Sequence, residues 1–275
     1  MKPEDLEFVA ALARNRTGMV LRGDKAFFIE NRLGSLARRE GLPSVPALIQ
    51  RLKSEPDEAL ARGVAEALTI GETAFFRDRT TFERLAEDIL PDLAAARGDK
   101  GLRIWCAGCS TGQEVYSLLM LIEENQARLG GVKAEILATD LSERALEKAQ
   151  SGVYTQFEVQ RGLPIRLLIR YFDKIDDTWR ASAGLRQLPR WAPLNLTDDL
   201  RALRGFDVIL CRNVLSHFDI TVRSRVMEQM AMALAPDGCL VLGADEAASF
   251  PDAFEPARGG AGLYSRNPAF ARAAA

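Results

Sequence analysis

The sequence has little histidine and cysteine, and it has no long apolar run. One of its 275 residues is a histidine, His217, and four are cysteines: Cys106, Cys109, Cys211 and Cys239. Cys106 and Cys109 form a CxxC, but the histidine has no ligand-like spacing to any cysteine, so we expect core or loop thiols and no metal site. No apolar run approaches the roughly 20 residues that span a bilayer, and the start, MKPEDLEF, lacks a signal peptide's basic-then-apolar order. We therefore expect a cytoplasmic protein.

An excess of basic residues is also absent. The formal net charge is −2 and the sequence pI is about 5.7, so the chain as a whole exerts no electrostatic pull on nucleic acid. We expect no nucleic-acid partner. The composition, 47% hydrophobic and 27% charged, is ordinary for a globular protein with one sizeable core or two modest domains.

A glycine-bearing turn dominates the middle of the sequence. Residues 102–114, LRIWCAGCSTGQE, run from an apolar segment through Gly108 and Gly112 into an amphipathic stretch, 113–129. This pattern predicts a strand, a tight turn and a helix, and open α/β sheets bind ligands at such junctions. No Gly-Lys-Ser/Thr follows and GxGxxG is missing, which excludes the Walker loop and the usual dinucleotide turn. A turn that merely closes a βα unit remains the alternative.

A second short strand ends in an acid. Residues 134–140, AEILATD, read as a buried strand, and a carboxylate at Asp140 has enough acceptor sites for both hydroxyls of a ribose. The two patterns together favour a nucleoside-containing cofactor. Because the phosphate cradle is missing, S-adenosylmethionine is favoured over NAD or ATP. The alternative is that Asp140 only caps the following helix.

The chain divides by pattern into two regions. Residues 1–90 carry helical patterns without a convincing strand, near 4–15, from Asp24 to 39, and near 45–53 and 58–68. From residue 101 strands and helices alternate, which predicts a mostly parallel sheet. We therefore expect a helical N-terminal domain and linker over 1–90, and an α/β domain over 91–275 with a small inserted hairpin near 173–190. Further expected strands are 191–196, 206–211, 239–242 and 263–265, and further expected helices are 142–150 and 221–234.

Positive charge is concentrated in the helical region. Residues 14–39 contain only two acidic residues, Asp24 and Glu30, and seven basic ones: Arg14, Arg16, Arg22, Lys25, Arg32, Arg38 and Arg39. The pattern predicts a basic helix face. It is either a solvated surface or a docking site for an acidic partner, where charge would mainly speed the encounter.

Three stretches together carry a family resemblance: GETAFFRD at 71–78, IWCAGCSTGQEVYS at 104–117 and FDVILCRNVLSHFD at 206–219. They resemble the chemotaxis receptor methyltransferase family (CheR), and the resemblance covers nearly the whole chain. It implies a Rossmann-like methyltransferase sheet with a small all-helical N-terminal domain. It also implies that the protein uses S-adenosylmethionine to convert glutamate side chains of chemoreceptors to methyl esters.

The resemblance assigns roles to single positions. The implied cofactor-binding residues are Thr73, Arg77, Glu114, Asp140, Asn195, Leu196, Arg212 and Asn213. Among them Arg77 is expected near the methionine carboxylate. Arg77, Arg212 and His217 are the implied catalytic residues.

The resemblance also implies the partner. Arg32 and Arg38 match family arginines that meet the receptor helix. The expected partners are therefore chemoreceptor cytoplasmic helical domains, with contact to membranes only through the receptors, and the protein is expected to be a monomer.

The chain departs from the family pattern at a few positions. Gly71 stands where the family usually has Asn, His217 where it usually has Tyr, and Lys174 where some members have Arg. The stretch 174–195 is shorter than in members that use a receptor tail peptide as a tether, which favours tether-independent recognition. Two other classes stay open: a regulatory module that binds the cofactor or another nucleotide and docks to receptors, and a methyltransferase for a small molecule or nucleic acid.

Overall fold

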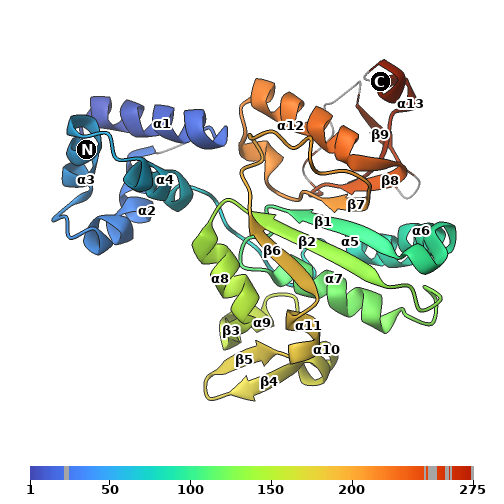
Figure 1. The fold of residues 1–275 in the computed structure, drawn as a ribbon. Helices are drawn as coiled ribbons and strands as arrows, with labels where there is room; N and C mark the ends of the chain where they lie inside the picture. The colour runs from blue at the N-terminus through green and yellow to red at the C-terminus, as the bar shows by residue number, and fades with distance from the viewer. Residues whose placement is uncertain (22–24, 245, 247–252, 258–259, 261, 274–275) are drawn as a thin grey trace. The chain divides into compact units, whose positions relative to one another are not determined.

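The computed structural model describes residues 1–21, 25–244, 246, 253–257, 260 and 262–273, and it contains two compact units (Figure 1). The first comprises Met1–Ile70 with Ser216–Ser224, and the second Gly71–Leu215 with Arg225–Ala275. The division between the units follows Ile70, whereas the expected helical domain and linker together extended to residue 90. The physical reason is burial: the apolar side chains of 71–90 join the core of the second unit through Phe75, Phe82 and Leu85.

The first unit is helical. Its helices are α1 (Pro3–Thr17), α2 (Lys25–Arg39), α3 (Val45–Ser54) and α4 (Glu58–Ala67). Ser44 caps α3 by accepting from the Ala47 amide at 3.3 Å, and Asp57 caps α4 by accepting from the Leu60 amide at 2.9 Å. Asp24 and Arg22 lie outside the described residues. The helices share one apolar core, which includes Val9, Ile29, Leu33, Leu48 and Val64.

The second unit is built on a seven-stranded sheet with the order β6-β2-β1-β7-β8-β10-β9. The strands are β1 (Leu102–Ala107), β2 (Ala134–Asp140), β6 (Pro189–Pro193), β7 (Phe206–Leu210), β8 (Leu234–Val241), β9 (Phe254–Pro256) and β10 (Leu263–Arg266). The first five of these pair in parallel, and β10 is antiparallel to β8 and β9. The expected α/β class with a mostly parallel sheet is therefore confirmed.

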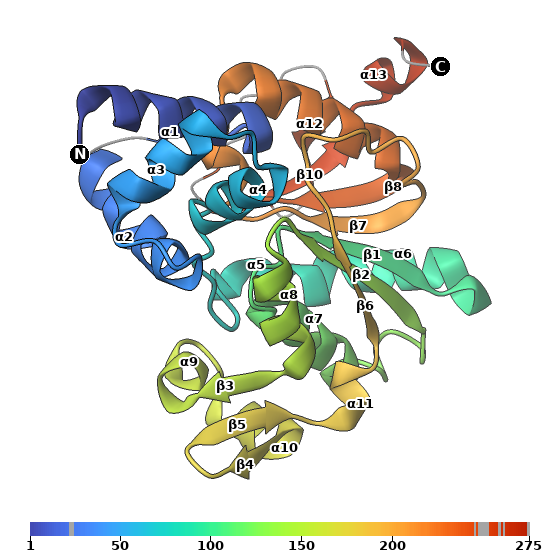
Figure 2. The same ribbon diagram turned by 60° about the vertical axis from the view of Figure 1, so that its left-hand side comes forward.

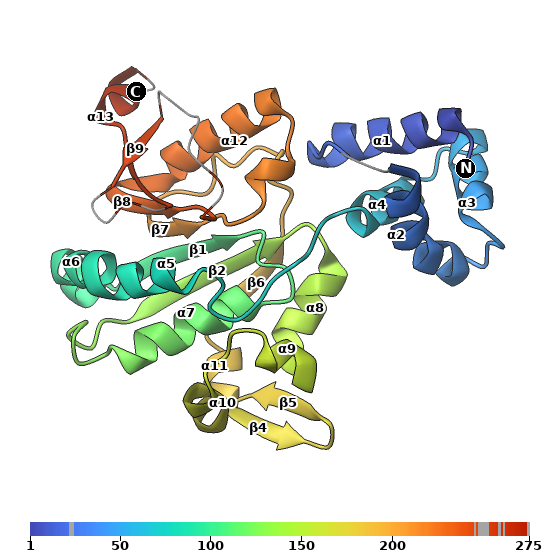
Figure 3. The same ribbon diagram turned by 180° about the vertical axis from the view of Figure 1, so that it is seen from behind.

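Helical segments precede, connect and follow these strands in the chain. They are α5 (Arg79–Arg84), the π-helix η1 (Leu85–Ile89), α6 (Leu90–Arg97), the 3₁₀ turns η2 (Gly98–Lys100) and η3 (Leu215–His217), α7 (Gln113–Glu124), α8 (Glu143–Ser151), α12 (Ile220–Ala233) and α13 (Pro268–Ala273). Figures 1 and 3 show α5, α6 and α7 on the same face of β1 and β2. The predicted helix 113–129 ends earlier, at Glu124, where the Asn125 side chain donates to the Leu121 carbonyl at 2.8 Å. No helix in the described ranges is long and apolar enough to cross a membrane.

A small antiparallel sheet is inserted between β2 and β6 (Figure 2). It has the order β3-β5-β4 and contains β3 (Val153–Thr155), β4 (Phe172–Ile175) and β5 (Thr178–Ala181), with helices α9 (Gln156–Gln160), α10 (Ile165–Tyr171) and α11 (Ala183–Arg186) around it. The hairpin expected near 173–190 corresponds to β4 and β5 only. It ends at Ala181 because residues from Pro189 onward pair with β2 in the large sheet.

Candidate active site

The candidate site lies where the parallel strands of the second unit end. Strand β1 sits between β2 and β7, and the chain order of the strands reverses there. Such a switch point is where open α/β sheets bind ligands. The turn after β1 lies against the end of β2, since the amides of Gly108 and Cys109 both donate to the Thr139 carbonyl, at 2.8 and 2.9 Å. The predicted strand, turn and helix of 102–114 are therefore all present.

Two glycines in this turn have no space for a side chain. Gly108 has φ +75°, and a Cβ there would lie 2.6 Å from Val214 Cγ2. Gly112 has φ +90°, and its Cβ would lie 2.8 Å from that of Ala149. Glycine adopts these left-handed angles at little cost, whereas other residues do not. Both glycines are thus needed for the tight path from β1 into α7.

Asp140 ends β2 as the sequence predicts. Its carboxylate accepts from the Ser110 amide at 2.7 Å and from the Ser142 amide at 2.9 Å. A carboxylate offers about four acceptor positions, so roughly two are left for a ligand. The cap of α8 is Ser142, whose hydroxyl accepts from the Ala145 amide. Burial raises the pKa of Asp140, while the bonds from Ser142 and Ser110 oppose that rise.

Arg212, just after β7, is buried in a network of acceptors. Its side chain is 1% exposed, and one terminal nitrogen donates to Glu114 at 2.8 Å. The other donates to the Asp78 carboxylate at 2.7 Å and to the Arg77 carbonyl at 2.6 Å. The guanidinium also lies 5.3 Å from the ring centroid of Phe82. Arg212 therefore connects the loop after β7, the start of α7 and the segment before α5.

Glu114 is the buried partner of this arginine. Burial raises the pKa of Glu114, and the Arg212 guanidinium opposes that rise through its charge and its hydrogen bond. The negative charge of Glu114 thus lies in a poorly solvated place, and burying a carboxylate there would cost much free energy without a hydrogen-bonded cation. Arg212 Nε is a buried donor without a hydrogen-bond partner in the part of the chain that the structure describes.

Backbone strain is concentrated at the same place. Several non-glycine residues have positive φ here: Phe76 at 47°, Asp78 at 55°, Ser110 at 50° and Asn213 at 58°. Each such conformation costs on the order of 1 to 3 kcal/mol and persists only where neighbouring groups hold it. The Phe76 amide donates to Ser117 Oγ at 2.9 Å, and the Ser110 hydroxyl donates to the Gly71 carbonyl at 2.8 Å. Strain of this kind is common at functional sites.

The remaining candidates in this unit lie in two groups. Arg77 donates to the Glu72 carbonyl at 3.1 Å and has no hydrogen-bonded carboxylate among the described residues. Thr73, half-buried, precedes it in the same segment. Asn195 follows β6, and its side-chain oxygen accepts from the amide and hydroxyl of Thr197 at 3.1 and 2.9 Å. Leu196 beside it is buried.

The other candidates belong to the first unit. His217 is half-buried, and its carbonyl accepts from the Val20 amide at 2.8 Å. The Arg32 guanidinium lies 5.5 Å from the ring centroid of Phe28, and Arg38 is exposed. The expected place of His217 beside the reacting groups therefore stays a prediction.

Two carboxylates were not predicted as site residues. Asp78 belongs to the GETAFFRD stretch, so its motif was a usable signal. Glu246 is 8% exposed and accepts from the amides of Asn213 at 2.7 Å and Gly243 at 3.1 Å. The one feature of the sequence that could have indicated Glu246 is its place shortly after a predicted strand, and Asp140 likewise lies at the end of one.

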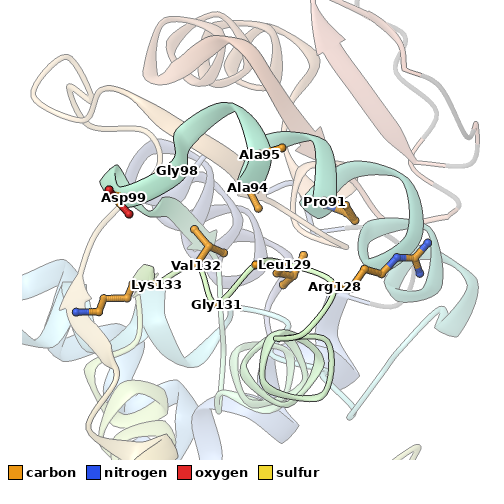
Figure 4. Close-up of a pocket in the computed structure, with 11 residues that line it drawn as sticks. Pro91, Ala94, Ala95, Gly98, Asp99, Arg128, Leu129, Gly131, Val132 and Lys133 are labelled. Atoms are coloured by element: carbon orange, nitrogen blue, oxygen red, sulfur yellow. The ribbon is translucent and has the colours of Figure 1, made fainter.

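A hollow of about 570 Å³ lies elsewhere in this unit (Figure 4). It is formed by α6, η2 and the segment that leads into β2, with Pro91, Asp99, Arg128 and Lys133 among its lining residues. This segment enters the amino end of β2, whereas Asp140 is at the carboxyl end. None of the candidate residues lines the hollow.

The family comparison agrees with this geometry. The family model for the CheR methyltransferase SAM binding domain matches residues 71–261, and the model for the CheR all-alpha domain matches residues 4–69. The chain belongs to the CheR methyltransferase family. It is a methyltransferase, and its cofactor is S-adenosylmethionine.

Similar proteins cover almost the full length of this CheR chain. Chemotaxis protein methyltransferase 1 of Pseudomonas aeruginosa is 37% identical over 95% of this chain and 97% of its own length. Chemotaxis protein methyltransferase Cher2 of Pseudomonas putida is 35% identical over 91% and 93%, respectively. The chemotaxis protein methyltransferase of Escherichia coli K12 is 32% identical over 86% and 82%.

The residues of the site fit S-adenosylmethionine. Asp140 keeps acceptor capacity for ribose hydroxyls after its two backbone bonds. Arg77 offers a cation for a carboxylate, and no described acid occupies that cation through a hydrogen bond. A carboxylate acceptor and a cation are both groups that suit a cofactor carrying hydroxyls and a carboxylate.

Proposed function

We propose that the protein transfers the methyl group of S-adenosylmethionine to glutamate side chains in chemoreceptor cytoplasmic helical domains, forming methyl esters. One observation carries the proposal: the chain covers 97% of a relative named chemotaxis protein methyltransferase 1, at 37% identity. The carboxylate and arginine groups at the switch point support it, since they suit this cofactor. The two alternative classes become outcomes of the test below.

The chemistry asks for alignment rather than for a base. A glutamate side chain has a pKa of about 4.3 and is already ionised near pH 7. When bound, S-adenosylmethionine would supply an electrophilic methyl group, whose bond to sulfur breaks as the glutamate oxygen bonds to the methyl carbon, leaving S-adenosylhomocysteine. Holding reacting groups in line supplies about 7 to 11 kcal/mol of a barrier. The residues of this chain therefore act mainly by binding and orientation.

Separate residues take separate parts of the cofactor in this proposal. Asp140 accepts from the ribose hydroxyls, Arg77 binds the methionine carboxylate, and Asn195 with Leu196 borders the adenine. Thr73 and Asn213 complete the cofactor contacts.

Arg212 acts in this scheme through its neighbours. Its terminal nitrogens already donate to Glu114, Asp78 and the Arg77 carbonyl. Its role is therefore to hold Glu114 and the Arg77 segment in place around the cofactor.

The first unit supplies the receptor contact in this proposal. Most of its basic side chains near the N-terminus form ion pairs: Arg14 with Asp219, Arg16 with Glu58, Lys25 with Glu7, and Arg39 with Glu40. Arg32 and Arg38 have no carboxylate partner among the described residues. Their charge is available to an acidic partner, which supports docking through α2.

A transfer assay tests the proposal. The purified protein and S-adenosylmethionine with a radiolabelled methyl group are added to membranes that contain the organism's chemoreceptors. Base-labile label on receptor glutamates is the expected result. Cofactor binding without transfer would instead establish the regulatory module, and base-stable label would establish a different substrate.

The same assay tests the tether. The segment between Lys174 and Asn195 contains a short hairpin, with β4 and β5 separated by Asp176 and Asp177. We propose that recognition needs no receptor tail peptide. Receptors that lack their C-terminal tail should be methylated as well as intact ones, and a large loss on truncation would contradict this.

A further inference from the structure

Asp78 and Glu246, which were not predicted as site residues, connect the turn after β8 with the turn after β7. The amides of Gly243 and Ala244, which are consecutive, donate to Glu246 at 3.1 Å and to Asp78 at 3.4 Å. The same two carboxylates also bind the turn after β7. Glu246 accepts from the Asn213 amide, and Asp78 accepts from the Arg212 guanidinium, both at 2.7 Å. Each acid therefore joins the two turns.

Asn213 is held on two sides by this arrangement. Its φ of 58° lies in the left-handed region, and Glu246 Oε2 accepts from its backbone amide at 2.7 Å. Its side chain packs against Gly243, where a Cβ would lie 2.6 Å from Asn213 Nδ2 and 2.9 Å from its Cγ. Gly243 itself is fixed by the second bond to Glu246. The carboxylate thus sets both the backbone of Asn213 and the surface on which its side chain rests.

We infer that Glu246 is a positioning residue that holds Asn213 in the orientation required to contact the cofactor. The inference rests on the proposed cofactor role of Asn213. A carboxylate suits the task because it is acceptor-only and takes two amide donors on one oxygen, and charge-assisted bonds of this kind are about twice as strong as neutral ones. Its near-complete burial keeps water from competing for those amides.

A double-mutant cycle tests the inference without a receptor. The affinity for S-adenosylhomocysteine is measured by calorimetry for the parent, Glu246→Ala, Asn213→Ala and the double variant. Hydrogen bonds to charged groups correspond to roughly a tenfold or larger change in an equilibrium constant. We expect each single variant to bind about tenfold more weakly. The double variant should bind S-adenosylhomocysteine no more weakly than whichever single variant has the lower affinity. The reason is that both substitutions remove the same contact, the one between Asn213 and the ligand.

Two further variants sharpen the cycle. Glu246→Gln keeps a carbonyl acceptor of the same length and should recover most of the affinity that Glu246→Ala loses. Glu255→Gln removes an exposed acid from β9 and should bind as the parent does. Circular dichroism and thermal unfolding identify variants that are folded. If Glu246→Ala does not fold, the cycle is run with Glu246→Gln, which should show a smaller loss and the same non-additivity.

Several results would overturn the inference. Losses that add fully in the double variant would show that Glu246 acts independently of Asn213. Unchanged affinity in folded Glu246→Ala would remove the role altogether, and so would a parent that does not bind S-adenosylhomocysteine. A parent that binds it, shows the expected coupling and yet labels no receptor glutamate would contradict the proposed function alone.

Discussion

Arg212 and Glu114 form a hydrogen-bonded ion pair, 2.8 Å between guanidinium nitrogen and carboxylate oxygen, although they follow different strands of the sheet. Arg212 follows β7 and Glu114 lies in the first turn of α7, after β1. The side chains are 1% and 13% exposed. The pair therefore spans the switch point of the sheet in a place where solvent screens charge little.

Arg212→Ala should strongly destabilise the protein. The change leaves Glu114 and Asp78 without the guanidinium, and breaking a buried ion pair by removing one partner costs about 3 to 5 kcal/mol. Urea unfolding at pH 7 measures the free energy of unfolding. Arg144→Ala, at an exposed position on α8, is the control and should change it little. A loss for Arg212→Ala no larger than that of the control would show that the pair is unimportant for stability.

The loss in Arg212→Ala should also grow as the pH rises. Burial raises the pKa of Glu114 in the folded parent. The stability that this shift contributes is present below the pKa of Glu114 in the unfolded chain, about 4.3. It is lost as the pH rises through the pKa of Glu114 in the folded protein. Arg212 opposes this rise, so its removal raises the pKa further. The difference in unfolding free energy between parent and variant should be larger at pH 8 than at pH 5. It should become nearly independent of pH when both proteins carry Glu114→Gln.

Asp140→Ala should weaken S-adenosylmethionine binding by roughly ten- to a hundredfold, because hydrogen bonds to a charged group contribute about 1.5 to 3 kcal/mol. The carboxylate has acceptor capacity beyond its bonds to Ser110 and Ser142. Calorimetry on the folded variant measures the affinity. Asp92→Ala, at an exposed position on α6, is the matched control and should bind normally. Normal affinity in Asp140→Ala would exclude the ribose contact.

Arg32→Glu combined with Arg38→Glu should reduce receptor methylation and leave cofactor affinity unchanged. The two residues lie on α2 of the first unit, whereas the cofactor candidates lie in the second. Most of the loss should be in association, and added salt should produce a similar loss in the parent. Arg128→Glu with Lys133→Glu, which line the hollow of Figure 4, reverses the same number of charges as a control. Equal methylation by the α2 variant and the parent at low salt would end the docking proposal.

Methyl transfer should change with pH between about 6 and 8 if His217 meets the incoming carboxylate, since an imidazole titrates near pH 6.5 and a phenol near 10. His217→Tyr should remove that change while keeping or raising activity. Initial rates across this range, with both substrates saturating, provide the measurement. A flat profile for the parent, or an unchanged profile for His217→Tyr, would assign His217 a structural role.

Features that depend on local pattern could be predicted from the amino-acid sequence. The glycine turn after residues 102–107, the acid at the end of 134–140 and the alternation of strands and helices all follow from short-range periodicity and turn chemistry. The family motifs added the cofactor. The boundary at Ile70 could not be predicted in this way, because 71–90 is helical by pattern while Phe75, Phe82 and Leu85 are assigned to the second unit only by the core in which they are buried.

The contacts that hold the site together depend on the tertiary fold and could not be predicted from local pattern. Arg212 is 98 positions from Glu114 in the chain, and it meets Glu114 because β1 and β7 are neighbours in the sheet. It meets the carbonyl of Arg77, 135 positions away, where the segment around Phe75 and Phe82 packs into the same core. Glu246 reaches Asn213 in the same way, through the pairing of β7 with β8. A carboxylate's partners depend on which strand ends lie side by side, and residue spacing carries no record of that. Local pattern therefore supplied the groups that suit the cofactor, and strand order supplied the contacts that position them.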